Sequence, residues 1–495
     1  MMQNLALLWE TSNTQRDHNS DCDCEDCACV DYNLTLRTSL ATRNNSSWHR
    51  PPHLYQTHLH NGHNLAFNPH GPVGVVVLDK QAHTALNMFG HPAPLVTELD
   101  RQLAHVGLIE PVDTQTIPHY TDKASCHSGK ATLTAWLHIT DRCNLRCRYC
   151  YLPHHKVDMT IETGQVAISA TFRSAVKHNY KAVKLKYSGG EAMLRFPLIK
   201  QLHQYAQQLA DQHGLTLEGV ILSNGTLLKS EIIEQIQQLD LRLMISLDGL
   251  GIYQDQQRFY AGSKGTSADV MNSIKLALSF GLRPYISITV TGQSAAGLPE
   301  LITWVLQHDL PFSLNFYREN ELSASHVDLQ LEEHKIIEGM VAAFKVIEDN
   351  LPRRSLLGSL VDRANLSAPH VKTCSVGQSY LVFDHQGHVS KCQMYQEQSV
   401  TTAQTDDPLA LIRADQIGIQ NLSVEEKEGC RDCEWKYWCT GGCPIATYRV
   451  TGRYDVQSPN CNIYKALYPE ALRLEGLRLL KWGVQHVHDE YKIGV

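Results

Sequence analysis

The chain of 495 residues lacks several features that would place it in a protein class at once. It has no apolar run of the length that a membrane span needs, and no basic stretch followed by an apolar one at its N-terminus. It also lacks a strong excess of charge, since its formal net charge is −7. We therefore expect a cytoplasmic protein with neither nucleic acid nor a membrane as its main partner.

Internal repeats are absent too, but cysteine is plentiful, with 15 residues. Fourteen of them form three groups, Cys22–Cys29, Cys143–Cys150 and Cys374–Cys461, and Cys126 stands alone. A cytoplasmic chain rarely keeps disulfides, so clustered cysteines predict metal ligands. The first group lies in residues 1–50, a polar stretch that we expect to be a flexible tail, and its four cysteines are either a small metal site or exposed thiols.

The second cysteine group is the centre of the sequence. It reads D-R-C-N-L-R-C-R-Y-C, with Cys143, Cys147 and Cys150 at C-x3-C-x2-C directly after the apolar run Leu133–Thr140. Three thiolates from one tight loop can hold a [4Fe–4S] cube whose fourth iron has no protein ligand. A zinc knuckle is the alternative, but a closed zinc site needs four ligands and this loop has three.

Apolar runs alternate with segments of helical period between residues 131 and 320. The predicted strands are Leu133–Thr140, Ala182–Tyr187, Leu217–Leu222, Leu241–Leu247, Pro284–Thr291 and Phe312–Tyr317. The predicted helices are Ile161–Lys177, Pro197–Gln212, Ser230–Leu239, Ala268–Phe280 and Pro299–His308. This alternation predicts an α/β fold with a parallel sheet curled into a partial (β/α)6 barrel of the TIM type, whose chemistry lies at the carboxyl ends of the strands.

Smaller units flank the predicted barrel. Residues 51–130 predict a winged-helix-like domain with a strand at Val73–Leu78 and a helix carrying Val96, Leu99, Leu103 and Val106. This domain either grips an extended peptide at a strand edge or caps the barrel. After the barrel we expect a helical linker over 321–370, a cysteine-rich domain over 371–465 and a C-terminal helix over 466–495.

Polar motifs follow three consecutive predicted strands. They are Ser188-Gly189-Gly190-Glu191, Ser223-Asn224-Gly225-Thr226 and Ser246-Leu247-Asp248-Gly249. Paired glycines let backbone groups approach a ligand closely, and a neighbouring carboxylate can accept an ammonium group. Serine and asparagine suit ribose hydroxyls or a carboxylate. Each motif alone would be a turn, and their common position around the cysteine loop favours a shared site.

Together, these motifs resemble the radical SAM superfamily over residues 131–320. The resemblance implies that Cys143, Cys147 and Cys150 hold a [4Fe–4S] cluster whose open iron is chelated by S-adenosylmethionine (SAM). Electron transfer would then give a 5′-deoxyadenosyl radical that abstracts hydrogen from the substrate. The implied SAM contacts are Tyr149 near the adenine, Gly189, Gly190 and Glu191 at the methionine ammonium, Ser223 and Asn224 at the ribose or carboxylate, and Ser246.

The third cysteine group has seven thiols, too many for one cube and one short of two four-thiolate cubes or two zinc ribbons. Its spacing resembles the SPASM extension of radical SAM enzymes. The resemblance implies an outer auxiliary [4Fe–4S] cluster on Cys430, Cys433, Cys439 and Cys461, and an inner one on Cys374, Cys392 and Cys443. The fourth ligand of the inner cluster is unassigned, with Cys126, His385 and His388 as candidates.

Acid–base partners carry the weakest signal. Asp248, Tyr317 and Arg318 lie at strand ends and are the predicted catalytic residues, and Arg258 is a further candidate. SPASM sulfatase maturases place an aspartate directly after the cysteine that matches Cys392. Gln393 stands there instead, which disfavours that activity.

The sequence therefore predicts a radical SAM/SPASM enzyme that modifies a ribosomal precursor peptide, by a crosslink, epimerisation or backbone excision. Its expected partners are that peptide, a leader-peptide recognition protein and an electron donor such as flavodoxin or ferredoxin. The alternatives are a radical SAM maturase of a protein side chain, a small-alcohol dehydrogenase, and a non-catalytic iron–sulfur or zinc scaffold.

Overall fold

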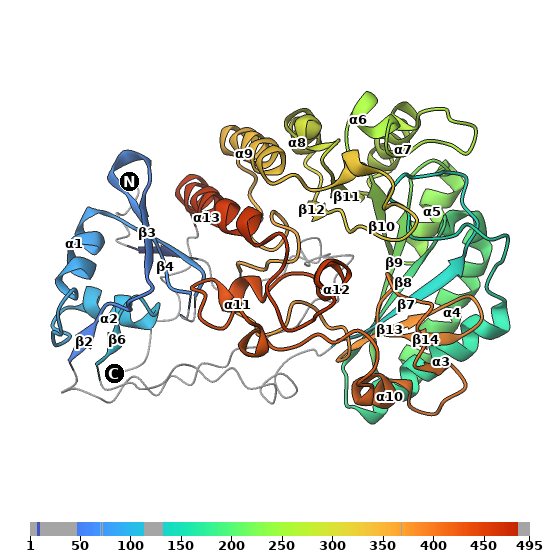
Figure 1. Ribbon diagram of the computed structural model, residues 1–495, viewed down its shortest axis with the longest axis horizontal. Helices are drawn as coiled ribbons and strands as arrows, with labels where there is room; N and C mark the ends of the chain where they lie inside the picture. Colours follow the sequence, from blue (N-terminus) through green and yellow to red (C-terminus); the bar gives the residue numbers. More distant parts are fainter. Residues whose placement is uncertain are drawn as a thin grey trace.

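A computed structural model describes residues 7–9, 47–112 (without 70 and 72), 132–367 and 369–483. The cysteine group Cys22–Cys29 and the isolated Cys126 lie outside the described residues. Three parts follow one another in space: a small N-terminal sheet, a C-terminal cysteine-rich part, and a barrel (Figure 1). One hydrophobic core runs through all three, because Leu65 and Phe67 of the first, Trp438 of the second and Leu133 of the third belong to the same buried cluster.

The barrel contains the predicted six parallel strands in sequence order. They are β7 (Thr132–Thr140), β8 (Ala182–Gly189), β9 (Thr216–Ser223), β10 (Leu241–Ser246), β11 (Tyr285–Val290) and β12 (Phe312–Phe316). The helices that connect them are α3 (Ile161–Lys177), α4 (Phe196–His213), α5 (Ser230–Gln238), the short α6 (Ile252–Asp255), α7 (Ser267–Ser279) and α8 (Leu298–Gln307). Except for the short α6, every one of these elements was predicted to within two residues at each end, and the partial barrel is confirmed.

The sheet continues beyond the barrel into the cysteine-rich part. Strand β13 (Tyr380–Phe383) pairs in parallel with β7, and β14 (His388–Ser390) and β15 (Thr401–Thr402) follow as antiparallel neighbours. Sequence analysis missed these three strands, because runs of two to four residues are too short to show a period. As a result, Cys374 and Cys392 stand before and after a hairpin that is part of the barrel's own sheet.

The N-terminal sheet has four antiparallel strands in the order β1 (Leu7–Trp9), β5 (Val75–Leu78), β4 (Asn64–Phe67) and β3 (Tyr55–His58). Helices α1 (Lys80–Met88) and α2 (Glu98–His105) pack against each other, and β2 (Trp48–His49) pairs with β6 (Glu110–Pro111). The expected tail over residues 1–50 is wrong at β1, where Leu7 is buried and pairs with Leu78. Val96 is exposed because a Thr97–Asp100 capping box starts α2 after it.

The remaining helices are α9 (Glu333–Asp349), α10 (Pro408–Ala414), α11 (Lys436–Cys439), α12 (Pro444–Thr451) and α13 (Cys461–Trp482). Helix α13 contacts α9 on one side and β1, β4 and β5 of the N-terminal sheet on the other. At this junction Phe67 stacks on Trp435, and the Tyr55 ring lies tilted against the same indole. The N-terminal sheet is therefore docked on the cysteine-rich part.

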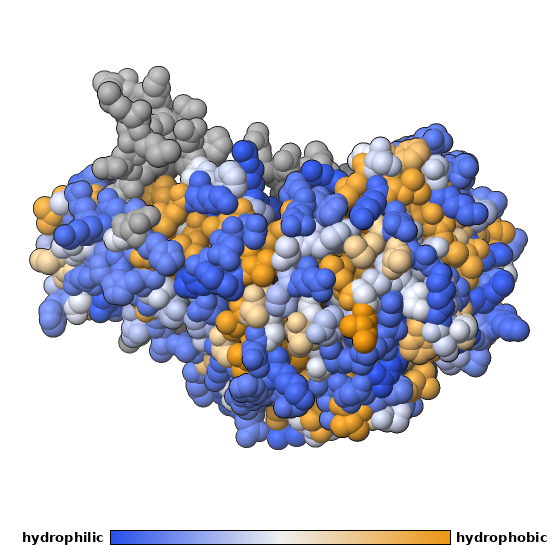
Figure 2. Space-filling model, turned by 90° about the horizontal axis from the view of Figure 1, so that it is seen from above, coloured by the Kyte–Doolittle hydropathy of each residue, from blue (hydrophilic) through white to orange (hydrophobic). Residues whose placement is uncertain are grey.

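Among the described residues, no helix is both long and apolar enough to cross a membrane. The face shown in Figure 2 carries hydrophilic side chains over most of its area, with hydrophobic groups scattered between them.

Candidate active site

A cavity that is partly open to solvent lies at the carboxyl ends of the barrel strands. Of the residues predicted to form the site, the cavity is lined by Cys143, Cys147, Cys150, Tyr149, Gly189, Gly190, Ser223, Asn224, Ser246, Arg258, Tyr317 and Arg318.

The three thiols of the barrel loop are brought together by the end of β8. The backbone N–H of Gly190 donates to the Thr140 carbonyl at 2.7 Å, and that of Glu191 donates to the Arg142 carbonyl at 2.9 Å. A Cβ on Gly190 would lie 2.4 Å from the Arg142 carbonyl oxygen, and one on Gly189 would lie 2.2 Å from the Thr140 oxygen. Both positions therefore need glycine, because any side chain there would push the cysteine loop away from the end of β8.

Glu191, the predicted contact for a ligand ammonium, is bonded to the ends of two strands. Its carboxylate is buried and accepts hydrogen bonds from the Ser223 hydroxyl (2.8 Å), the Asn224 N–H (2.6 Å) and the Met193 N–H (3.0 Å). It is absent from the residues that line the cavity. The carboxylate thus ties the ends of β8 and β9 together, and its contact with a ligand ammonium stays a prediction.

The end of β9 is also bound to the cysteine loop by an amide pair. The side-chain amide of Asn224 donates to the side-chain oxygen Oδ1 of Asn144 at 2.9 Å. The side-chain amide of Asn144 donates in turn to the Thr226 hydroxyl at 2.8 Å. Sequence analysis did not single out Asn144, although it follows Cys143 directly. This pair fixes the loop relative to the wall that Ser223 and Asn224 form.

Asp248 lies behind the wall as well. Its carboxylate accepts the Tyr149 hydroxyl and the Thr289 N–H (2.8 Å), and the Arg258 guanidinium donates to the same Tyr149 oxygen. Burial raises the pKa of the Tyr149 phenol well above its usual value. Asp248 is fully buried and holds Tyr149 and Arg258, which line the cavity, and its catalytic role stays a prediction.

Tyr317 and Arg318 do reach the cavity. The Tyr317 hydroxyl bonds to the Ser323 hydroxyl at 2.7 Å, and Arg318 donates to Asp362 at 2.7 Å. Their catalytic role stays a prediction. Arg363 and Met394 line the same wall and were missed, because both come from segments far from the barrel motifs in sequence.

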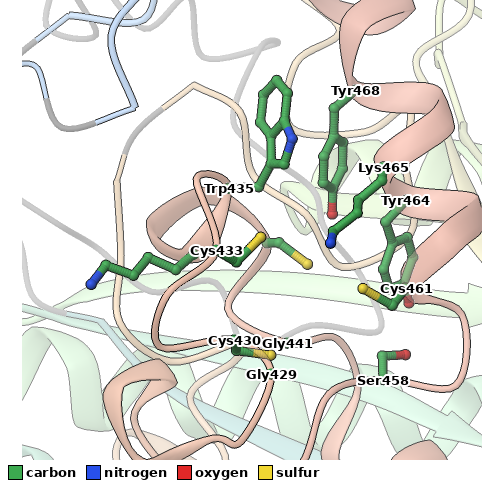
Figure 3. A pocket seen from close by; sticks show the side chains of 12 residues that line it. Gly429, Cys430, Cys433, Trp435, Gly441, Ser458, Cys461, Tyr464, Lys465 and Tyr468 are labelled. Atoms are coloured by element: carbon green, nitrogen blue, oxygen red, sulfur yellow. The ribbon is translucent and has the colours of Figure 1, made fainter. Parts of the chain in front are cut away.

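The four thiols predicted for the outer auxiliary site line a separate pocket. In Figure 3, Cys430, Cys433 and Cys461 surround this hollow and the hydroxyl of Tyr468 points toward them. That hydroxyl is buried and has no nitrogen or oxygen partner among the described residues. Burial raises the pKa of Cys430 to about 12 and of Cys439 to about 11, so a bound cation is needed to hold them as thiolates.

The three thiols predicted for the inner site, Cys374, Cys392 and Cys443, share one apolar cluster with Trp136. The Trp136 indole N–H is buried and has no partner in the described part of the chain. Burial raises the pKa of Cys443, but the guanidinium groups of Arg318 and Arg363 outweigh that effect and lower it. Both arginines line the barrel cavity, so the inner thiols lie directly behind its wall.

The two histidines considered as a fourth inner ligand have other partners. His385 lies 3.8 Å from Asp141, and His388 bonds to Asp384 at 2.9 Å. Over the described ranges, no three His, Cys, Asp or Glu side chains converge closely enough to share one metal ion. The fit to cubes rests instead on the two sets of thiols. Four line the outer pocket, and three share the inner apolar cluster with the buried Trp136 N–H. In a cube, each thiolate binds a different iron.

Comparison with known proteins relates part of the chain to a known family. The model of the radical SAM superfamily matches residues 137–305. An uncharacterized protein of Methanocaldococcus jannaschii is 27% identical over 221 residues, covering 44% of this chain and 74% of its own. The Fe-coproporphyrin III synthase of Methanosarcina barkeri is 22% identical over 412 residues, covering 73% of this chain and 96% of its own.

Among solved structures, native anSMEcpe with bound AdoMet and Kp18Cys peptide superposes with a TM-score of 0.59. The match covers 70% of this chain and 99% of that one at 17% sequence identity. At this level of identity, the likeness shows a common fold.

Proposed function

The chain carries a radical SAM domain, and on that premise we propose that it modifies a ribosomally made precursor peptide by hydrogen abstraction. The observation that carries the proposal is the shared wall of the barrel cavity. Cys143, Cys147 and Cys150 line it, and so do Arg318 and Arg363, whose charges lower the pKa of the inner thiol Cys443. A substrate in this cavity would meet both the site of SAM and the neighbourhood of an auxiliary site.

A [4Fe–4S] cluster and SAM, when bound, supply the chemistry of hydrogen-atom abstraction. The residues of the chain hold the cluster-binding loop and the cavity wall in place. Cys143, Cys147 and Cys150 would hold three irons, and the Asn144–Asn224 pair keeps their loop against the end of β9. The Tyr149 hydroxyl is held by Asp248 and Arg258.

Two features support a peptide as the substrate. Strand β3 pairs only with β4 among the described residues, so an extended segment can add to its open edge. The protein of similar fold, anSMEcpe, was solved with a bound peptide. A crosslink, an epimerised residue and backbone excision all begin with the same hydrogen abstraction.

The test uses the full-length protein, reconstituted anaerobically with iron and sulfide and supplied with SAM and dithionite. A short peptide encoded by a reading frame beside the gene is added, and both 5′-deoxyadenosine and the peptide mass are followed. The proposal expects a mass change that depends on SAM and is absent in the Cys143→Ala variant. Formation of 5′-deoxyadenosine without any change in such peptides would contradict the peptide assignment and leave the radical SAM assignment intact.

A further inference from the structure

A buried lysine lies between the two sets of auxiliary thiols. Lys427 is 1% exposed, and its carbonyl oxygen accepts the N–H of Cys430, one of the outer thiols, at 3.1 Å. Its ammonium donates to the Thr440 carbonyl at 2.7 Å. Thr440 follows another outer thiol, Cys439, in the segment that leads to the inner thiol Cys443. The ammonium is thus anchored on the stretch of chain that passes from one site to the other.

That stretch has an unusual backbone. Thr440, Gly441 and Gly442 all have positive φ, at +53°, +82° and +71°. Three such residues in a row turn the chain so that Cys439 faces the outer pocket while Cys443 joins the inner apolar cluster. A Cβ on Gly441 would lie 2.8 Å from Lys427 Cδ, 3.2 Å from its ammonium nitrogen and 3.3 Å from Cys430 Sγ. The lysine side chain and the Cys430 thiol therefore pack against the same glycine.

A threonine ties the same point to the inner site. The Thr373 hydroxyl lies 2.8 Å from the Gly442 carbonyl and 3.1 Å from the Thr440 carbonyl, the oxygen that also accepts from Lys427. Thr373 directly precedes Cys374, an inner thiol. One carbonyl group thus joins the segments that carry Cys374, Cys439 and Cys443.

Lys427 has no carboxylate partner within ion-pair distance in the described part of the chain. A buried ammonium without a countercharge is strongly unfavourable. Burial lowers the pKa of Lys427, and four cysteines oppose that effect once they are thiolates: Cys430 and Cys439 of the outer set, and Cys374 and Cys443 of the inner set. Clusters bound through thiolates carry net negative charge, and they would supply the missing countercharge at both sites.

We propose that the Lys427 ammonium is a shared countercharge of the two auxiliary clusters and raises the reduction potential of both. A fixed positive charge favours the reduced form of a cluster, which carries one more negative charge. Lys427 is a positioning residue in this account, since it acts through the clusters. The inference rests on cluster binding at the two thiol sets and is independent of the identity of the peptide.

The experiment is a potentiometric titration of the full-length, anaerobically reconstituted protein, followed by electron paramagnetic resonance, with iron counted for each sample. K427M removes the charge at similar length, and K427R keeps it. K436M is the matched control: Lys436 lines the outer pocket at its solvent edge, where it pairs with Glu425 at 3.2 Å. The barrel cluster is the internal reference.

We expect K427M to lower the potentials of both auxiliary clusters, K427R to stay near wild type, and K436M to shift the outer cluster at most. Unchanged potentials in K427M at full iron content, a shift of only one auxiliary cluster, or an equal effect of K436M would overturn the proposal. If K427M loses auxiliary iron, retention by K427R supports the proposal, and loss by both variants overturns it. Wild-type protein with iron at the barrel site alone would also overturn it, while SAM cleavage would still stand.

Discussion

The Ser223 hydroxyl donates to the Glu191 carboxylate at 2.8 Å, so the ends of β8 and β9 are joined behind the cavity that they line. The Gly-Gly-Glu and Ser-Asn-Gly-Thr motifs, which the sequence assigns to ligand binding, are thus hydrogen-bonded to each other. The position of the cysteine loop depends on this bond, because the Glu191 and Gly190 backbones hold the loop at Arg142 and Thr140.

Glu191→Gln tests this structural role. The carboxylate oxygens accept from two backbone N–H groups and one hydroxyl, and the amide group of glutamine must turn a donor toward at least one of these donors. We expect a loss of about 1–3 kcal/mol in the free energy of unfolding. Chemical denaturation of the cluster-free protein measures it, with the exposed Glu162→Gln as the control. An unchanged midpoint would contradict the role.

Gly190→Ala tests the approach of the loop to β8. Because the new methyl group would lie 2.4 Å from the backbone oxygen of Arg142, the loop has to move and the barrel thiols separate. Reconstituted iron is expected to fall from about twelve to about eight per chain, the content of two cubes. Gly262→Ala is the control, since its Cβ meets nothing within 4 Å. Full iron in Gly190→Ala would show that the loop adapts.

Asp248→Ala tests whether Asp248 supports the wall. Removing the carboxylate leaves the buried Arg258 guanidinium without its anionic partner, which costs about 3–5 kcal/mol. We expect this loss in denaturation of the cluster-free protein, and a smaller loss in Tyr149→Phe, which keeps both charges. The exposed Asp211→Ala is the control. Loss of activity at unchanged stability would instead indicate direct chemistry by Asp248.

His203 predicts a dependence of stability on pH. Burial lowers the pKa of this imidazole to about 4, whereas an unfolded histidine titrates near 6.5. The unfolded chain therefore binds more protons between these values, and the free energy of unfolding falls as pH drops from about 6.5 to 4, by the order of 3 kcal/mol.

Denaturation midpoints at several pH values measure this effect. His203→Phe should flatten the profile in that window, and the exposed His334→Gln should follow wild type. A variant at His203 that keeps the full wild-type slope would contradict the assignment.

The sequence predicts the barrel well because its strands and helices are long enough to show their periods. Strands β13 to β15 were not predicted because they are too short to show a period. Thr401–Thr402, for example, pairs only because tertiary contacts bring it beside β14. Strand β1 was not predicted because Leu7–Trp9 is a short apolar run at the start of a polar stretch.

At the site, spacing identifies the thiols and the strand ends but not the direction of each side chain. Glu191 and Asp248 follow their strands as predicted, yet both carboxylates turn behind the wall. Arg363 and Met394 reach the cavity only through the fold. Lys427 belongs to no recognised motif, and only the folded structure shows that it lies between the two sets of thiols.

The most direct test of the account compares wild type with the triple variant Cys143→Ala, Cys147→Ala, Cys150→Ala after identical anaerobic reconstitution. Iron and 5′-deoxyadenosine are measured in the presence of SAM and dithionite. The account predicts 5′-deoxyadenosine from wild type, none from the variant, and retention of about eight of twelve irons in the variant. Zinc in place of iron, or 5′-deoxyadenosine formed equally by both proteins, would contradict it.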